Sequence, residues 1–220
     1  MKKAAILVAG GLGTRMNYAL PKQFLELNGK PILFYTLDKF YSYDPEMELV
    51  VVIPEAYFSF WKELSNAHQI EIPHTLVVGG NNRYQSVKNG LSKIENASIV
   101  AIHDGVRPFI TPAFIGRLFD EAEKFGSAVP IKPVAETVRR INNDSNIVLP
   151  RQEIFLMQTP QIFRYEWLEK AYKIPYEESI TDDAMLIEQA GFALHFSEGL
   201  TYNIKITTPE DLIWAQKNIE

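Results

Sequence analysis

The sequence predicts an α/β fold in which a mainly parallel β-sheet carries helices on both faces. Short apolar runs typical of buried strands alternate with amphipathic helical segments along most of the 220 residues. Such alternation is typical of strand–helix–strand units, whose strands pair in parallel. No tandem repeat, low-complexity tract or Ser/Gly-rich linker divides the sequence. We therefore expect a single domain over residues 1–220, long enough to bury a substantial core.

Composition excludes several classes of protein and site. The formal net charge of −5 argues against a nucleic-acid partner, which requires a basic surface. The absence of cysteine excludes a disulfide scaffold, a zinc–thiolate site and a cysteine nucleophile. No apolar run approaches the roughly 18 residues of a membrane helix, and the N-terminus lacks a signal-peptide pattern. We expect a cytoplasmic protein without a membrane partner.

A glycine-rich segment at residues 10–15 follows the first predicted strand, residues 4–8. Its sequence, GGLGTR, permits a sharp turn, and its backbone N–H groups can cradle an anion. Arg15 and Lys22 add cations suited to phosphate. The segment matches neither the Walker A pattern nor the dinucleotide fingerprint. The alternative is a glycine-rich surface turn with incidental cations.

The first half of the chain alternates regularly. Asn28 and Gly29 favour a tight turn, and Pro31 begins a helix that continues to residue 40. Further helices are expected over residues 54–68 and through residues 87–94. Apolar runs predict strands over residues 49–53, 75–78 and 98–102.

The second half contains a change of pattern. Thr111 and Pro112 are expected to begin a helix that ends at Gly126, before a strand over residues 127–131. Residues 138–141 and 147–149 then read as a β-hairpin, which is marginal in water unless it packs on something. Helices are expected over residues 164–173, 181–189 and after a capping box at 208–211, and a short strand over 203–207.

Two polar strings follow predicted strands, where ligands of open α/β sheets bind. The string GGNNRYQSV at residues 79–87 offers backbone groups and the Ser86 hydroxyl to a nucleotide, or else is a turn with Ser86 at a helix start. In HDGVRPF at 103–109, Asp104 can meet phosphate-bound Mg²⁺ or a substrate hydroxyl and Arg107 can clamp a phosphate, unless the two form a buried pair. We interpret His103 as a satisfied histidine at a strand end. The helix dipole explains Asp182 and Asp183 better than metal binding does.

These strings, together with PKQF at 21–24, TPQIF at 159–163 and NIKIT at 203–207, resemble the sugar-phosphate nucleotidyltransferase family and its cytidylyltransferase branch. The sequence departs from the family at Asn81, where an acid is common. The resemblance implies a Rossmann-like three-layer α/β/α nucleotidyltransferase sandwich. It also implies a β-hairpin dimerisation arm at about residues 135–150, and hence a homodimer.

The resemblance further implies that CMP passes from CTP to a sugar-alcohol phosphate with release of pyrophosphate and assistance from Mg²⁺. TDDA at 181–184 and the lack of cysteine favour the isoprenoid branch, which uses a methylerythritol phosphate, over the ribitol 5-phosphate branch. A catalytically silent nucleotide-binding protein is the remaining alternative. Intact Arg15, Lys22, Asp104 and Lys205 argue against it.

Residue roles come from the same resemblance. Arg15 and Lys22 would stabilise the transition state, and Arg151 and Lys205 would position the attacking phosphate. The residues implied to bind CTP are Ala9, Gly10, Gly11, Gly13, Gly80, Ser86, Asp104 and Gly105. Those implied to bind the second substrate are Asp104, Arg107, Thr137, Arg151, Thr159 and Lys205. Arg151 and Thr159 could come from the partner chain, and Asp104 would contact metal weakly, mostly through CTP phosphates. Without the resemblance, Arg151 and Lys205 read as solvated surface charges.

Overall fold

The computed structural model describes residues 1–11, 20–142 and 145–219, and within them a mixed eight-stranded sheet forms the centre. One half is parallel, in the order β5 (Thr75–Val78), β4 (Glu48–Ile53), β1 (Lys3–Val8) and β6 (Ile99–Asp104). Next to β6 lies β11 (Gln161–Arg164), which runs antiparallel to both β6 and β7 (Ser127–Pro133). Two short strands, β10 (Phe155–Met157) and β12 (Phe196–Glu198), pair with β7. The predicted α/β class with a mostly parallel sheet is confirmed.

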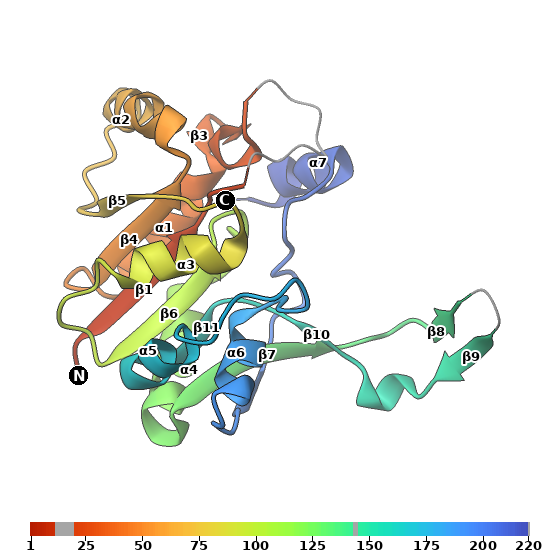
Figure 1. Cartoon of the computed structure of the whole chain (residues 1–220). Coiled ribbons are helices and arrows are strands. Elements are labelled where there is room, and N and C mark those ends of the chain that lie inside the picture. The colour runs from red at the N-terminus through yellow and green to blue at the C-terminus, as the bar shows by residue number, and fades with distance from the viewer. Residues whose placement is uncertain (12–19, 143–144, 220) are drawn as a thin grey trace.

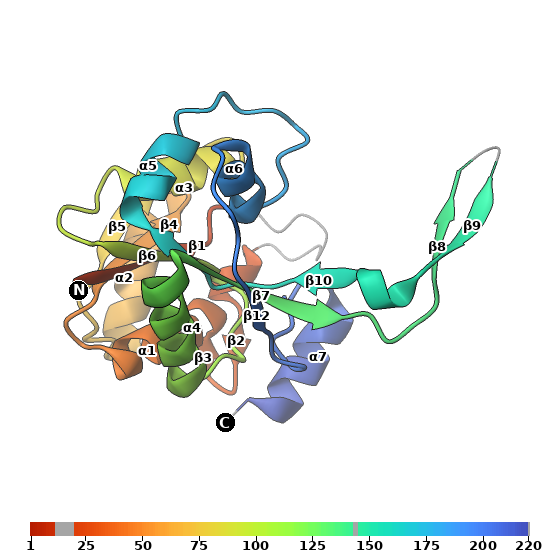
Figure 2. The same ribbon diagram turned by 90° about the horizontal axis from the view of Figure 1, so that it is seen from below.

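Helices cover both faces of the sheet (Figures 1 and 2). Ala5 and Leu7 of β1 face a core shared with α1 (Ile32–Tyr43), α2 (Phe58–Ala67) and α4 (Pro112–Phe125). Ala4 and Ile6 face a second core shared with α3 (Arg83–Leu91), α5 (Tyr165–Ala171) and α6 (Asp183–Gln189). Because alternate side chains of a strand point to opposite faces, one apolar run supplies both cores. The last helix, α7 (Pro209–Asn218), packs on a third cluster that includes Leu27 and Ile32. Among the described helices, none has both the length and the apolar character needed to cross a membrane.

Local chemistry sets the element boundaries as predicted. The Thr111 hydroxyl accepts from the Phe114 N–H at 3.1 Å to cap α4, which ends at Gly126 with φ +88°. Thr208 and Asp211 form the capping box of α7. Asn28 and Gly29, both with positive φ, turn the chain between β2 (Glu26–Leu27) and β3 (Lys30–Pro31).

Other boundaries differ from the prediction. α3 begins at Arg83 under an Asn82 cap, so Ser86 lies one turn inside the helix, and α3 ends at Leu91. The strand β6 includes His103 and Asp104 instead of ending before them. A short 3₁₀ turn (Glu55–Tyr57) precedes α2. The predicted strand over residues 203–207 is wrong, because these residues pair with no described strand. A single backbone hydrogen bond, from Ile206 N–H to Val106 O at 3.0 Å, joins them to the turn after β6.

The predicted hairpin exists as β8 (Val138–Ile141) and β9 (Asn146–Leu149), and it projects from the body of the molecule (Figures 1 and 2). Three of its apolar side chains are exposed: Ile141 by 71%, Ile147 by 41% and Val148 by 55%. An apolar hairpin without a core of its own gains little stability in water. Its role as a dimerisation arm stays a prediction.

Candidate active site

A cleft of about 370 Å³ opens where β1, β5 and β6 end, at the carboxyl edge of the parallel strands. This is the edge at which open α/β sheets bind ligands. The lining residues among those described come from the strand ends, the start of α3 and the segment before α7. They are Val8, Ala9, Gly10, Gly11, Lys22, Gln23, Gly80, Asn81, Asn82, Arg83, Ser86, Asp104, Val106, Lys205 and Thr207.

Glycines let the ends of β1 and β5 meet above β4. Ala9 N–H donates to Val52 O at 2.8 Å and Gly79 N–H to Ile53 O at 2.9 Å, so the segments that follow β1 and β5 are both bonded to the end of β4. A Cβ on Gly79 would lie 3.2 Å from Gly10 Cα, so a larger residue there would push the two backbone segments apart. The buried Gln23 amide donates to Ala9 O at 2.6 Å and to Gly11 O at 3.1 Å. Gln23, which the sequence analysis did not single out, thus holds the start of the glycine segment.

Gly13 and Arg15, to which the sequence analysis gave roles, lie outside the described residues. The structure therefore describes the two ends of the predicted anion cradle, Gly11 and Lys22. Lys22 Nζ donates to Ile206 O at 2.9 Å, which brings it beside the segment that carries Lys205.

The Ser86 hydroxyl braces the loop between β5 and α3. It accepts from Gly80 N–H at 3.0 Å and donates to Asn82 O at 2.9 Å. Ser86 is buried yet lines the cleft. It therefore fixes the Gly80 backbone at the cleft, and its predicted contact with a nucleotide stays a prediction.

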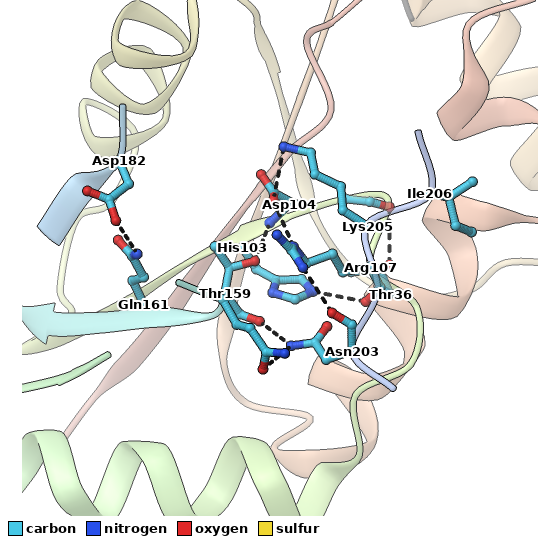
Figure 3. Close-up of polar contacts among 12 residues, drawn as sticks. Thr36, His103, Asp104, Arg107, Thr159, Gln161, Asp182, Asn203, Lys205 and Ile206 are labelled. Atoms are coloured by element: carbon cyan, nitrogen blue, oxygen red, sulfur yellow. Dashed lines mark hydrogen bonds and ion pairs between the residues drawn. The ribbon is translucent and has the colours of Figure 1, made fainter. Parts of the chain in front are cut away.

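Three cations surround the carboxylate of Asp104. Arg107 Nε lies 2.9 Å and Lys205 Nζ 3.2 Å from Oδ2, and Arg83 Nε lies 3.8 Å from Oδ1. Figure 3 shows Lys205 and Arg107 converging on Asp104 from opposite sides. Burial by itself would raise the pKa of Asp104, but the charges of Lys205, Arg83 and Arg107 outweigh burial and hold that pKa well below its usual range. Asp104 is therefore ionised at neutral pH.

The side chain and the backbone carbonyl of Asn203 hold the segment that carries Lys205 in place. Asn203 Nδ2 donates to Thr159 O at 2.7 Å, and Asn203 O accepts from Arg107 Nη1 at 2.9 Å. These bonds tie this segment to the turn after β6 and to the loop before β11 (Figure 3).

A second cavity of about 250 Å³ adjoins the cleft and shares Arg83, Asp104 and Lys205 with it. Arg107 and Thr159 also line this cavity, and Thr159 Oγ1 accepts from Asp104 N–H at 3.1 Å. Thr159 thus lies in a cavity of its own chain. The cleft and this cavity therefore meet at Asp104.

Two predicted substrate residues lie elsewhere. Thr137 and Arg151 are exposed at the base of the hairpin and line neither cavity formed by the described residues, and Arg151 Nη1 donates to Ala135 O at 2.7 Å. Gly105 also lines neither of these two cavities. A Cβ on Gly105 would meet Leu33 Cδ1 at 2.9 Å and Ala9 Cβ at 3.0 Å, so packing under the cleft requires glycine there.

The prediction of a satisfied histidine is confirmed for only one ring nitrogen of His103, because Nδ1 is buried without a hydrogen-bond partner among the described residues. His103 is fully buried, and its Nε2 lies 3.1 Å from Arg107 O. Burial lowers the pKa of His103 to about 4, so the ring is neutral at pH 7.

Arg83, which received no role from the sequence, has a buried partner in Asp183. Arg83 forms a bidentate pair with Asp183, with Nη1–Oδ1 at 2.9 Å and Nη2–Oδ2 at 2.6 Å. Asp183 is buried in the first turn of α6, where the helix dipole favours an acid, and it has Arg83 as a partner in addition. Asp182 caps α6 by accepting from Met185 N–H at 3.0 Å. The arginine within GGxxR was the available signal.

No group of three or more His, Cys, Asp and Glu side chains able to hold a metal occurs in the ranges 1–11, 20–142 and 145–219. Among the described residues that line the cleft, Asp104 supplies the carboxylate that a metal could contact. Three cationic side chains already lie beside that carboxylate.

Comparisons with known proteins agree on one family. A family model described as 2-C-methyl-D-erythritol 4-phosphate cytidylyltransferase matches residues 3–220. The protein of that name from Bacteroides thetaiotaomicron is 42% identical over 212 residues, which cover 96% of this chain and 97% of the relative. The solved 4-diphosphocytidyl-2C-methyl-D-erythritol synthase of Anaerococcus prevotii is 28% identical with a TM-score of 0.85, covering 98% of this chain and 95% of that one. The solved 2-C-methyl-D-erythritol 4-phosphate cytidylyltransferase of Francisella tularensis is 32% identical with a TM-score of 0.79, covering 99% of each chain.

Proposed function

This chain belongs to the 2-C-methyl-D-erythritol 4-phosphate cytidylyltransferase family, and we propose that its reaction takes place where the two cavities meet at Asp104. The enzyme transfers CMP from CTP to 2-C-methyl-D-erythritol 4-phosphate. The products are 4-diphosphocytidyl-2-C-methyl-D-erythritol and pyrophosphate, on the non-mevalonate route to isoprenoid precursors. The family assignment does not favour transfer to ribitol 5-phosphate or a silent nucleotide-binding protein.

One observation carries the proposal for the site: Arg83, Asp104 and Lys205 line both cavities. CTP occupies the larger cavity, with its cytosine near Gly80 and its phosphates toward Gly10, Gly11 and Lys22. Methylerythritol phosphate occupies the smaller cavity beside Thr159 and Arg107. The shared residues then lie where the two phosphate groups approach each other.

The chemistry needs positive charge more than it needs a general base. A phosphate oxygen of methylerythritol phosphate is already anionic, and it attacks the α-phosphorus of CTP in line. The new O–P bond forms as the bond from the α-phosphorus to the pyrophosphate oxygen breaks, and pyrophosphate leaves with the electron pair. Lys22, together with Arg15, offsets the charge that builds on the α-phosphate and the leaving group.

Asp104 keeps the cations of the second cavity in place before substrate arrives. Its Oδ2 holds Lys205 and Arg107 at 3.2 and 2.9 Å, close to where a substrate phosphate would sit. Lys205 can turn from Asp104 to that phosphate because its side chain is 39% exposed. Preset cations lower the cost of bringing two polyanions together.

Mg²⁺ is proposed to enter with the CTP phosphates. The described residues do not build a metal site of their own, and a carboxylate contacted by three cations is a poor first ligand. Mg²⁺ commonly binds through substrate phosphates plus one or two carboxylates, and Asp104 is the candidate for that contact. The ion would neutralise triphosphate charge.

A homodimer completes the proposed site. The exposed hairpin would pack on a second chain and carry Thr137 and Arg151 toward the smaller cavity of that chain. Arg151 and Lys205 would then hold the attacking phosphate from two subunits. A cytoplasmic location belongs to the same proposal.

Pyrophosphate release tests the function directly. We expect turnover from CTP with methylerythritol phosphate, and far less with ribitol 5-phosphate or with ATP or GTP, since backbone groups around Gly80 leave room for a pyrimidine. Turnover that is equal with ribitol 5-phosphate would contradict the proposed second substrate. Turnover that is equal with ATP would contradict the proposed base pocket.

A further inference from the structure

Arg83 lies at the boundary between the two cavities, and Asp183 holds its side chain there. Arg83 lines both cavities, and its side chain is 27% exposed. Its two terminal nitrogens both donate to Asp183, which leaves Nε facing Asp104 Oδ1 at 3.8 Å. A bidentate pair fixes the plane of a guanidinium as well as its position. The orientation of Arg83 therefore depends on Asp183.

Asp183 itself has no contact with the space where substrates bind. It is fully buried and lines neither the cleft nor the adjoining cavity among the described residues, and the same is true of Tyr172. The Tyr172 hydroxyl donates to Asp183 Oδ1 at 2.5 Å. Asp183 Oδ1 thus accepts from both the Arg83 guanidinium and the Tyr172 hydroxyl.

The backbone that carries Asp183 is tied to the central sheet. Asp183 is the first residue of α6, and Gln161 of β11 holds this helix end by two hydrogen bonds. Gln161 Nε2 donates to Asp182 Oδ2 at 2.8 Å, which Figure 3 shows, and Gln161 Oε1 accepts from Ala184 N–H at 3.0 Å. The Asp183 carboxylate therefore has a fixed place relative to β6 and Asp104.

We propose that Asp183 and Tyr172 are positioning residues for cytidylyl transfer, which act by holding the Arg83 guanidinium between the two substrates and against Asp104. The ion pair with Asp183 orients the Arg83 guanidinium and largely neutralises its charge. Arg83 therefore sets the relative position of the two substrates and does not act as a mobile cation. This inference rests on the proposed function of the two cavities. It assigns a catalytic purpose to an ion pair that joins residues 100 positions apart.

The first test replaces the charge without changing the shape. Asp183→Asn should lower kcat by about tenfold or more, because small misplacements of reacting groups cost rate steeply. KM should change less than kcat, since Asp183 touches neither cavity. Activity is measured per folded enzyme with CTP and methylerythritol phosphate, and wild-type turnover is established first. An inactive wild type would refute the proposed function, whereas an active wild type and an equally active Asp183→Asn variant would refute this inference.

A double variant separates positioning from stability. Arg83→Gln combined with Asp183→Asn restores a neutral pair and removes any unpaired buried charge. If Asp183 acts through Arg83, the double variant should have the kcat of Arg83→Gln alone even when its melting temperature recovers. Recovery of kcat along with the melting temperature would reduce the pair to a structural role. Losses that multiply in the double variant would show that Asp183 acts without Arg83. Either result overturns the proposal.

Neighbouring tyrosines provide a matched pair of variants that keep every charge. Tyr172 and Tyr84 stack with ring centroids 5.0 Å apart, but the Tyr84 hydroxyl donates to Tyr172 O and Ile174 O instead of Asp183. Tyr172→Phe and Tyr84→Phe each remove one hydroxyl and should lower the melting temperature comparably. Only Tyr172→Phe should also lower kcat, by severalfold. Equal kcat values in the two variants would exclude Tyr172 from positioning.

Discussion

Lys22 and Lys205 bring cations to the same cleft from opposite ends of the chain, and each is held by a neighbour. Lys22 Nζ donates to Ile206 O, next to Lys205, which pairs with Asp104. A cation placed in advance costs no reorganisation when charge develops in the transition state. We therefore expect loss of the Lys22 side chain to affect the rate of the reaction more than the stability of the fold.

We expect Lys22→Ala to lower kcat by on the order of 10²–10³, the usual cost of one electrostatic stabiliser, with little change in melting temperature. The same is expected of Arg15→Ala. Lys62→Ala, on the exposed side of α2, is a control that should leave kcat unchanged. Near-normal turnover of Lys22→Ala would contradict its role, and failure of both the Lys22→Ala and Arg15→Ala variants to fold would favour a structural turn.

His103 gives a pH prediction with a definite sign. Burial holds the pKa of His103 at about 4, below the value of about 6.5 expected in an unfolded chain. Between these values the unfolded chain binds a proton that the folded protein does not. The contribution of His103 to the free energy of unfolding therefore falls as pH drops below about 6.5, and its loss levels off near pH 4. Nitrogen chemical shifts of its ring should report a neutral imidazole from about pH 5 to 8. A titration midpoint near 6.5 would contradict this placement.

At the scale of elements, the hairpin of β8 and β9 gives a test of assembly. Val148 is 55% exposed on the hairpin and Ile213 is 54% exposed on α7, so the two side chains are matched in exposure. If the hairpin packs on a second chain, Val148→Asp should raise the dimer dissociation constant by about tenfold or more and lower activity, because it buries a charge. Ile213→Asp should do neither. Sedimentation would detect the difference, and a fully active wild-type monomer would refute the arm.

Local chemistry explains which elements could be predicted from the sequence. The Thr111 cap, the Asn28 turn and the capping box at Thr208 depend on residues within a few positions, so their boundaries match the structure. β11 and β12 are short, and only contact with β6 and β7 makes them strands, so their own sequences contain too little signal. Residues 203–207 have the composition of a strand, but they leave the sheet to carry Lys205 over the cleft.

The candidate site could be predicted in part for the same reason. Lys22, Asp104 and Lys205 lie in recognisable strings, and the structure brings them together. The pair of Arg83 and Asp183 joins α3 to α6, and no local pattern predicts a contact across 100 positions. Arg83 falls within the GGxxR string, but neither that string nor the acid at the start of α6 indicates that the two residues pair.

At the scale of the whole molecule, the two cavities and the hairpin lie apart. The cavities occupy the carboxyl edge of the parallel strands. The hairpin extends away from the body (Figure 2). Thr137 directly precedes β8, and Arg151 lies two residues after the end of β9. Of the two residues proposed to hold the phosphate, Lys205 lines the smaller cavity and Arg151 lies at the base of the hairpin. A two-fold dimer would let the hairpin of each chain bring Arg151 to the cavity of the other chain. The complete site would then belong to the dimer.

Subunit mixing measures this most directly. Arg151→Ala and Lys205→Ala homodimers should each have a low kcat and a raised KM for methylerythritol phosphate, with little change in KM for CTP. In a mixed dimer, one site would lack both cations and the other would keep both. Random exchange of equal amounts should therefore restore about a quarter of wild-type activity, since half the dimers are mixed and each has one intact site. No recovery in dimers shown to have exchanged subunits would contradict an active site that combines the cleft of one chain with the arm of another.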